Sequence, residues 1–347
     1  GAFSLSRTVL LPLFGRLSDR KGRKPFIVAG LLAYALVSVA FIFSSEVTHL
    51  IAVRFFQGMA SAMIMPVIQA YVGDITPAGR EGFTMGLFNM SVFFGLSLGP
   101  AAGGLLNDHF SLTAAFVCMG LLAFLGFSLC LVLLPPSHEE RARRTGRAPM
   151  PWRTILGDRV VSGLVVYRLM YTAAIGMIWS FLPVLADARF HLSSSRIGVL
   201  VMLGVFASGV IQVPMGYLAD RVNRSAMVVT GGLMAAAGVF AYDWASTSLG
   251  LYFASLIFGI GGGTAMPALM AVAVDKGSET QSMGSVISLL TMGHSLGMLC
   301  GSVGAGLMMD WFDLGHAFSM GGVAMILGIV VFWICMRPGF IPIREKS

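Results

Sequence analysis

Charged residues are scarce in this chain of 347 residues. Asp, Glu, Lys and Arg make up 11% of it, whereas hydrophobic residues make up 56%. A soluble domain typically carries about 25% charged residues, because its surface must be hydrated. The shortage of charge argues against a soluble protein, and the excess of apolar residues predicts a membrane protein.

Cysteine is also scarce, and the sequence lacks the spacings that bind metals or build disulfide frameworks. It shows neither a phosphate-binding glycine loop nor a nucleophile beside a base. We therefore expect no enzyme, no metal and no cofactor. The four cysteines lie inside apolar stretches and are interpreted as packing residues: Cys118, Cys130, Cys300 and Cys335.

Long apolar stretches recur along the whole chain. A helix needs about 20 apolar residues to cross the roughly 30 Å hydrocarbon core of a bilayer. The chain begins inside the first such stretch, so we expect the natural protein to start further upstream. The eleven expected spans are residues 1–17, 26–43, 50–72, 82–106, 112–134, 160–185, 197–218, 226–242, 249–274, 282–308 and 316–335.

The basic residues are distributed in alternate loops. A net charge of +7 would also suit a nucleic-acid partner, but 18 of the 23 Lys and Arg lie in one alternating set of loops and the C-terminus. Cytoplasmic loops carry such an excess. We therefore expect a lipid bilayer and no nucleic acid as partner, with residues 16–24, 141–159, 221–224 and the C-terminus in the cytoplasm.

An internal repeat relates the two sides of the polar stretch 135–159. Matching residues lie 201 positions apart, as in Gly15 and Gly216, Arg20 and Arg221, Asp19 and Asp220, Pro66 and Pro267, and Asp74 and Asp275. Subtracting 201 from the span 160–185 places its counterpart upstream of Gly1. We therefore expect two six-helix halves in parallel repeat, with eleven of twelve helices present. The expected parts are an N-terminal half (1–134), a cytoplasmic linker (135–159) and a C-terminal half (160–347).

The segment from Gly15 to Lys24 carries a specific pattern, Gly-x-Leu-x-Asp-Arg-x-Gly-Arg-Lys. It resembles the cytoplasmic-loop signature of the major facilitator superfamily. The resemblance implies a conformational gate in which Asp19 meets a helix N-terminus or an arginine. A basic loop that only sets topology is the alternative. The second copy is weaker, with Asn223 in place of Gly22. The expected gate residues are Gly15, Asp19, Arg20, Gly22, Arg23, Lys24, Gly216, Asp220 and Arg221.

Two further segments resemble helix motifs of the same family. Arg54 and Gln57 match the fourth-helix pattern Arg-x-x-Gln-Gly, and their spacing places both on one helix face. Arg54 could line a cavity or extend to the membrane interface. The fifth-helix pattern associated with antiporters is matched by Gly95, Gly99, Pro100, Gly103 and Gly104. It implies a bend and close helix contact. For Gly293, Gly297 and Gly301 we expect simple helix packing.

Other intramembrane residues are candidates for a cavity or for coupling: Arg7, Arg168, Tyr171 and His294. Tyr167, Trp179, Phe181 and the methionines could line a drug pocket, but packing is the simpler interpretation. None of the sixteen Asp and Glu residues lies deep in a span, whereas three arginines do. A counter-charge is therefore expected. Either an anionic substrate or a carboxylate on the helix upstream could supply it, and we favour the carboxylate.

The whole chain resembles the twelve-span drug:proton antiporter branch of the superfamily. The resemblance implies proton-linked efflux of small hydrophobic or amphipathic compounds by alternating access, with protons and a small-molecule substrate as partners. It also implies a monomer in a bacterial-type inner membrane. Two alternatives are a proton-coupled uptake symporter for a small metabolite or organic anion, and a non-transporting membrane sensor.

Overall fold

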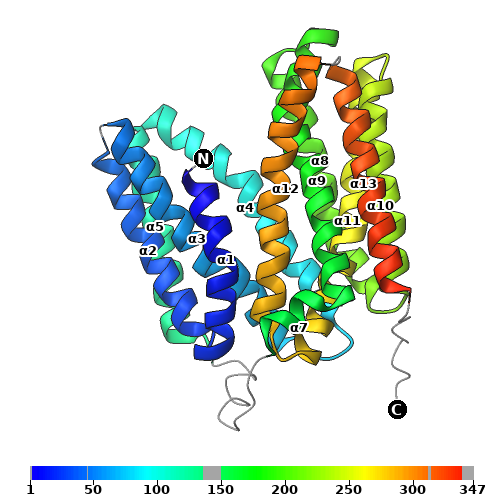
Figure 1. Ribbon diagram of the computed structural model, residues 1–347. Coiled ribbons are helices and arrows are strands. Elements are labelled where there is room, and N and C mark those ends of the chain that lie inside the picture. Colours follow the sequence, from blue (N-terminus) through cyan, green and yellow to red (C-terminus); the bar gives the residue numbers. More distant parts are fainter. Residues whose placement is uncertain (1, 45, 136–149, 312–313, 338–347) are drawn as a thin grey trace. The chain divides into compact units, whose positions relative to one another are not determined.

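The described part of the computed structural model is helical and contains no strand. It covers residues 2–44, 46–135, 150–311 and 314–337 (Figure 1). The helices are α1 (Ala2–Lys21), α2 (Lys24–Ile42), α3 (Val47–Ile75), α4 (Glu81–His109), α5 (Leu112–Leu133), α7 (Trp152–Gly157), α8 (Arg159–Phe190), α9 (Ser194–Ala219), α10 (Arg224–Trp244), α11 (Ser248–Glu279), α12 (Met283–Trp311) and α13 (Leu314–Met336).

Each expected span corresponds to one long helix. Within the described residues, nine helices are long and apolar enough to cross a membrane. Helices α1 and α4 fall outside that group. Basic side chains such as Arg7 and Arg16 interrupt the apolar sequence of α1, and α4 is rich in glycine. The chain is therefore a multi-span helical membrane protein.

The segment expected as a loop at residues 16–24 is mostly helical, which corrects the sequence-based boundary. Helix α1 continues through Asp19 to Lys21, and α2 begins at Lys24. Gly22 lies between them with a φ of +94°, a conformation that favours glycine because it has no Cβ. The expected linker contains the short helix α7. Residues 136–149 of the linker lie outside the described part.

The chain forms two compact units, each containing a helix segment from the other side of the linker. The first unit comprises Gly1–Thr76, Gly95–Trp152 and Lys276–Met292. In it α3 packs on α1 and α2, and α2 packs on α5. The second unit comprises Pro77–Phe94, Arg153–Asp275 and Gly293–Ser347. In it α13 packs on α8 and α10. The first unit thus includes the beginning of α12, and the second includes the beginning of α4.

Glycine packing joins α12 to α8 within the second unit. A Cβ added at Gly293 would lie 3.1 Å from the carbonyl oxygen of Val165. At Gly297 and Gly301 an added Cβ would overlap backbone atoms of α8, including the carbonyl oxygens of Leu169 and Ala173. The prediction that these glycines serve helix packing is confirmed, because small residues let two helix backbones approach closely.

Candidate functional site

Asp19, near the end of α1, lies at the N-terminus of α12 within the first unit. Its carboxylate accepts hydrogen bonds from the backbone N–H groups of Gly284 and Ser285, each at 2.7 Å, and from the Ser285 hydroxyl. The first N–H groups of a helix have no partner inside the helix, and the helix dipole favours an anion there. Asp19 is fully buried, so water does not replace these contacts.

Arg23 completes what we call the Asp19 cluster: Asp19, Arg23, Asp74 and the N-terminus of α12. Its Nη1 lies 2.7 Å from Asp19, and its Nε lies 2.9 Å from Asp74. The arginine and both carboxylates are almost fully buried. Close backbone approach holds this arrangement, because a Cβ added at Gly15 would lie 2.5 Å from the carbonyl oxygen of Gly284.

A second cluster repeats this geometry within the second unit. Asp220 follows α9 and accepts hydrogen bonds from the backbone N–H groups of Gly82 (2.7 Å) and Phe83 (2.8 Å), at the N-terminus of α4. An added Cβ at Gly82 would lie 2.5 Å from the carbonyl oxygen of Gly216. Burial raises the pKa of the Asp220 carboxyl above its ordinary value, although both N–H groups and Arg224 oppose the shift. Asp220 therefore takes up a proton at higher pH than an exposed aspartate would.

Arg224 is the centre of this Asp220 cluster, which comprises Asp220, Arg224, Glu81, Asp275 and the N-terminus of α4. The guanidinium lies 2.7 Å from Glu81 and 3.3 Å from Asp220, and it also pairs with Asp275. The gate residues expected from the sequence did not include Arg224 and Glu81. The repeat itself contained the signal for Arg224, because Arg23 and Arg224 are also 201 positions apart.

Three of the charged gate residues expected from the sequence lie outside the two clusters. Arg20 and Arg221 are exposed, and Arg221 stacks on the ring of Tyr217 at 3.9 Å. Lys24 is the first residue of α2 and is half-buried. Asn223, which replaces the glycine of the first copy, caps α10 by accepting a hydrogen bond from the N–H of Ala226. The second copy therefore begins its helix with an asparagine cap in place of the glycine. It keeps the Asp–Arg pair as Asp220 and Arg224.

The antiporter-type run lies on a continuous part of α4, and the described residues show no close contact at its three glycines Gly95, Gly99 and Gly103. An added Cβ at Gly95, Gly99 or Gly103 meets no atom of the described residues within 4 Å. Pro100 and Gly104 lie outside the residues whose side-chain surroundings are described. The expectation that another helix packs tightly on these glycines is therefore wrong for the described part of the chain.

Arg54 and Gln57 are joined on one face of α3, as their spacing predicts. Arg54 donates to the Gln57 side-chain oxygen at 3.1 Å, and Gln57 donates to the Tyr34 hydroxyl on α2 at 3.1 Å. The Arg54 guanidinium also lies over the ring of Phe41 at 5.3 Å. Gln57 is buried, whereas Arg54 is exposed.

The other candidate side chains belong to both units. Arg7 on α1 has a buried Nε atom with no hydrogen-bond partner among the described residues. In the second unit Arg168 contacts the Met266 sulfur, and half-buried His294 lies on α12. Tyr171 stacks on Phe258 with ring centroids 5.6 Å apart and is a core residue, which corrects its assignment to a cavity. Tyr167 is buried in the same core.

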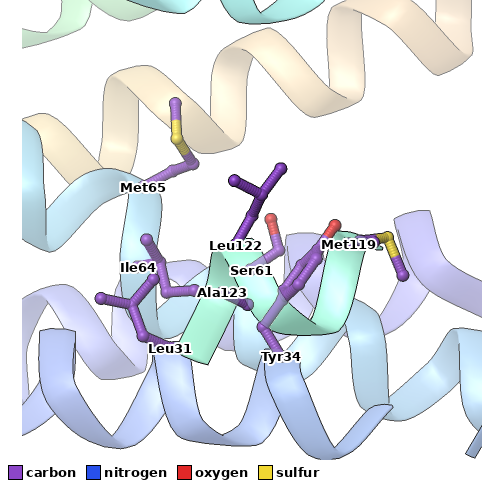
Figure 2. Close-up of a pocket in the computed structure, with 8 residues that line it drawn as sticks. All are labelled: Leu31, Tyr34, Ser61, Ile64, Met65, Met119, Leu122 and Ala123. Atoms are coloured by element: carbon purple, nitrogen blue, oxygen red, sulfur yellow. The ribbon is translucent and has the colours of Figure 1, made fainter. Parts of the chain in front are cut away.

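A pocket of about 400 Å³ lies between α2, α3 and α5 of the first unit (Figure 2). The close-up shows the hydroxyls of Tyr34 and Ser61 among apolar side chains. The Tyr34 hydroxyl connects the pocket to Gln57 and Arg54. The lining residues are Leu31, Tyr34, Ser61, Ile64, Met65, Met119, Leu122 and Ala123.

The corresponding place in the second unit is filled by α8. Residues 201 positions after Leu31 and Ser61 are Gly232 and Gly262. An added Cβ at Gly232 would lie 2.8 Å from the Tyr167 hydroxyl, and one at Gly262 would overlap the Tyr171 hydroxyl. Met266, the counterpart of Met65, contacts Arg168. The pocket in the first unit therefore matches the surface that α8 covers in the second.

Comparison with known proteins agrees with the repeat. A sequence model described as Major Facilitator Superfamily matches residues 1–189 and again residues 164–346. The two matches together cover almost the whole chain, and they overlap at residues 164–189, within α8.

Individual relatives are similar over most of their length. Multidrug resistance protein 2 of Bacillus subtilis is 25% identical over 96% of this chain and 84% of its own length. The class C tetracycline resistance protein of Escherichia coli is 27% identical over the same shares. Among solved structures, a human organic anion transporter covers 95% of this chain and 82% of its own, with a TM-score of 0.82 and 19% identity. That likeness concerns the fold.

Proposed function

Given that this chain belongs to the major facilitator superfamily, we propose that it is a proton-linked antiporter that exports small hydrophobic or amphipathic compounds. The observation that carries the mechanism is the matched pair of aspartates. Asp19 binds the N-terminus of α12 and Asp220 binds the N-terminus of α4, each across the linker in sequence. Such contacts can hold one end of the transport path closed and release it in another state.

The basic residues beside both clusters support a cytoplasmic location for this end of the helices. In this proposal the two clusters close the cytoplasmic side, and the protein works as a monomer in the inner membrane with a cytoplasmic C-terminus. The direction of transport is supported by the antiporter-type run on α4 and by relatives whose names include multidrug and tetracycline resistance.

Inverted membrane vesicles test both the direction and the coupling. With an acidic interior, vesicles containing the full-length protein should accumulate ethidium or tetracycline, and adding either compound should release protons from the interior. Vesicles without the protein provide the control. Proton-driven accumulation of an organic anion in right-side-out vesicles, without drug uptake in inverted ones, would instead establish an uptake symporter.

Gly99→Leu tests whether the run on α4 has a transport role beyond packing. Because no described atom lies within 4 Å of an added Cβ, we expect normal folding and an unchanged melting temperature. If the run serves antiport, drug-driven proton release in proteoliposomes should fall at least about tenfold, or a passive proton leak should appear, since the α4 surface changes. Normal transport without a leak would contradict the antiport role.

A carboxylate upstream of Gly1 is the expected partner of the arginines in the first unit. In the described part of the chain neither Arg7 on α1 nor Arg54 on the candidate span α3 forms an ion pair. An antiporter also needs a group that exchanges a proton for substrate. Neutralising an Asp or Glu in the upstream span should abolish proton coupling while ligand binding remains. If that span has no acid, or if coupling survives, an anionic substrate or His294 becomes the better explanation.

A further inference from the structure

Gln212 on α9 carries a fully buried amide that no described residue pairs with. Its side chain is 0% exposed, and neither Oε1 nor Nε2 has a hydrogen-bond partner among the described residues. Ser208, one helical turn earlier, is also buried, and its Oγ has none either. Buried polar groups nearly always find partners, because leaving one unpaired costs free energy. The amide and the hydroxyl therefore raise the free energy of the conformation in which both are buried.

The beginning of α4 covers this part of α9 within the second unit. Residues 208, 212 and 216 lie on one face of α9, because they are spaced four apart. Asp220 continues this row directly after the helix. An added Cβ at Gly86 would lie 2.5 Å from the Gln212 carbonyl oxygen, and one at Gly209 would lie 3.3 Å from the Phe93 side chain. Asp220 holds the same segment of α4 through Gly82 and Phe83.

The repeat shows that packing at this position does not require a polar side chain. The residue 201 positions before Gln212 is Leu11, on α1 in the first unit, and it is also 0% exposed. An apolar side chain thus fills the equivalent buried position. The amide at position 212 therefore needs another explanation, and water or a polar ligand in a second conformation supplies one.

We propose that Gln212 and Ser208 form a polar wall of the cytoplasmic access path, which α4 covers in this structure. Release of α4 from Asp220 exposes the wall, and its amide and hydroxyl then hydrogen-bond water or the polar groups of a substrate. Burial without partners makes the covered state less stable and so promotes reopening. The proposal rests on the alternating access inferred above, and it assigns a role to two residues outside both aspartate clusters.

Cysteine labelling in the full-length protein tests the covering. In a variant without the four native cysteines, Gln212→Cys should react slowly with a membrane-impermeant maleimide added to inverted vesicles. Adding Asp220→Asn should raise the rate at least about tenfold, because α4 loses its anionic partner. Val228→Cys is the control, since Val228 lies in the core of the second unit with 0% exposure and should stay unreactive in both backgrounds. Equal rates for Gln212→Cys in both backgrounds would overturn the proposal.

Gln212→Leu tests the energetic part of the inference. Placing the counterpart residue of the repeat at this position should raise the melting temperature and shift the equilibrium about tenfold toward the covered state. Transport should slow accordingly. A lower melting temperature would show that the amide is well paired and would overturn the inference. Drug transport by the unsubstituted protein is measured separately. If the protein transports no drug but Asp220→Asn still raises the labelling rate of Gln212→Cys, the proposed function is refuted and the covering of Gln212 by α4 stands.

Discussion

Asp19→Asn is expected to shift the conformational equilibrium of the transporter by about a hundredfold away from the state with α12 bound to α1. The substitution removes the charge that receives two backbone N–H groups, the Ser285 hydroxyl and Arg23 in a buried site. Hydrogen bonds to charged groups contribute about 1.5–3 kcal/mol each, and the amide keeps only part of them. Transport should fall strongly, whereas expression and ligand binding should remain.

Distances between spin labels on the two helices would measure this shift, and vesicle assays would measure transport. Arg20→Gln is a matched control, because Arg20 neighbours Asp19 in sequence but is exposed. It should leave both measurements nearly unchanged. Normal transport by Asp19→Asn with an unchanged ratio of states would remove the basis for a gate at the Asp19 cluster.

Gly301→Leu is expected to abolish correct folding. A Cβ at this position would overlap the carbonyl oxygen of Ala173, and its next neighbours are also backbone atoms of α8. Backbone atoms cannot move aside as a flexible side chain can, so α12 and α8 must separate. Overpacking costs roughly 1–3 kcal/mol or more in a well-packed core. Separating α12 from α8 would also lose packing contacts between the two helices. The yield of monodisperse protein and its melting temperature should both fall sharply.

Gly95→Leu provides the matched comparison, since an added Cβ there meets no described atom within 4 Å. The two substitutions change the same residue type to the same side chain on long helices. Only the one at position 301 should prevent folding. If both variants fold equally well, α12 does not pack on α8 as closely as the backbone contacts at Gly301 require.

The sequence alone was sufficient for the helical membrane architecture, because each span is a run of apolar residues with a defined length. The repeat and the position of Asp19 also follow from the residues. The resemblance implied a helix N-terminus or an arginine as the partner of Asp19, but it did not identify which helix. Gly284 and Ser285 lie 265 and 266 positions away and have no unusual chemistry, because every residue except proline carries a backbone N–H group. Their N–H groups donate to the carboxylate only because the start of α12 lies beside α1.

Glycine runs show a second limit of sequence reasoning. Gly95, Gly99 and Gly103 have the same spacing as Gly293, Gly297 and Gly301. In the described residues the second run packs against α8, whereas the first meets open space. The spacing shows that a helix could approach closely, but the approach itself depends on which helix lies opposite. Tyr171 was misplaced for a related reason, since a position within a span does not decide whether the side chain borders a cavity or the core.

The pocket in Figure 2 affects how ligands should be screened. The corresponding surface of the second unit is covered by the tyrosines of α8, so a surface of this kind can bind apolar groups. Detergent tails, lipids and greasy compounds can stabilise a protein by filling such a surface without being transported. A compound that raises the melting temperature of the protein should therefore also be tested in vesicles. Only a compound that is both bound and transported is a substrate, whereas one that is bound without being transported merely fills the apolar surface.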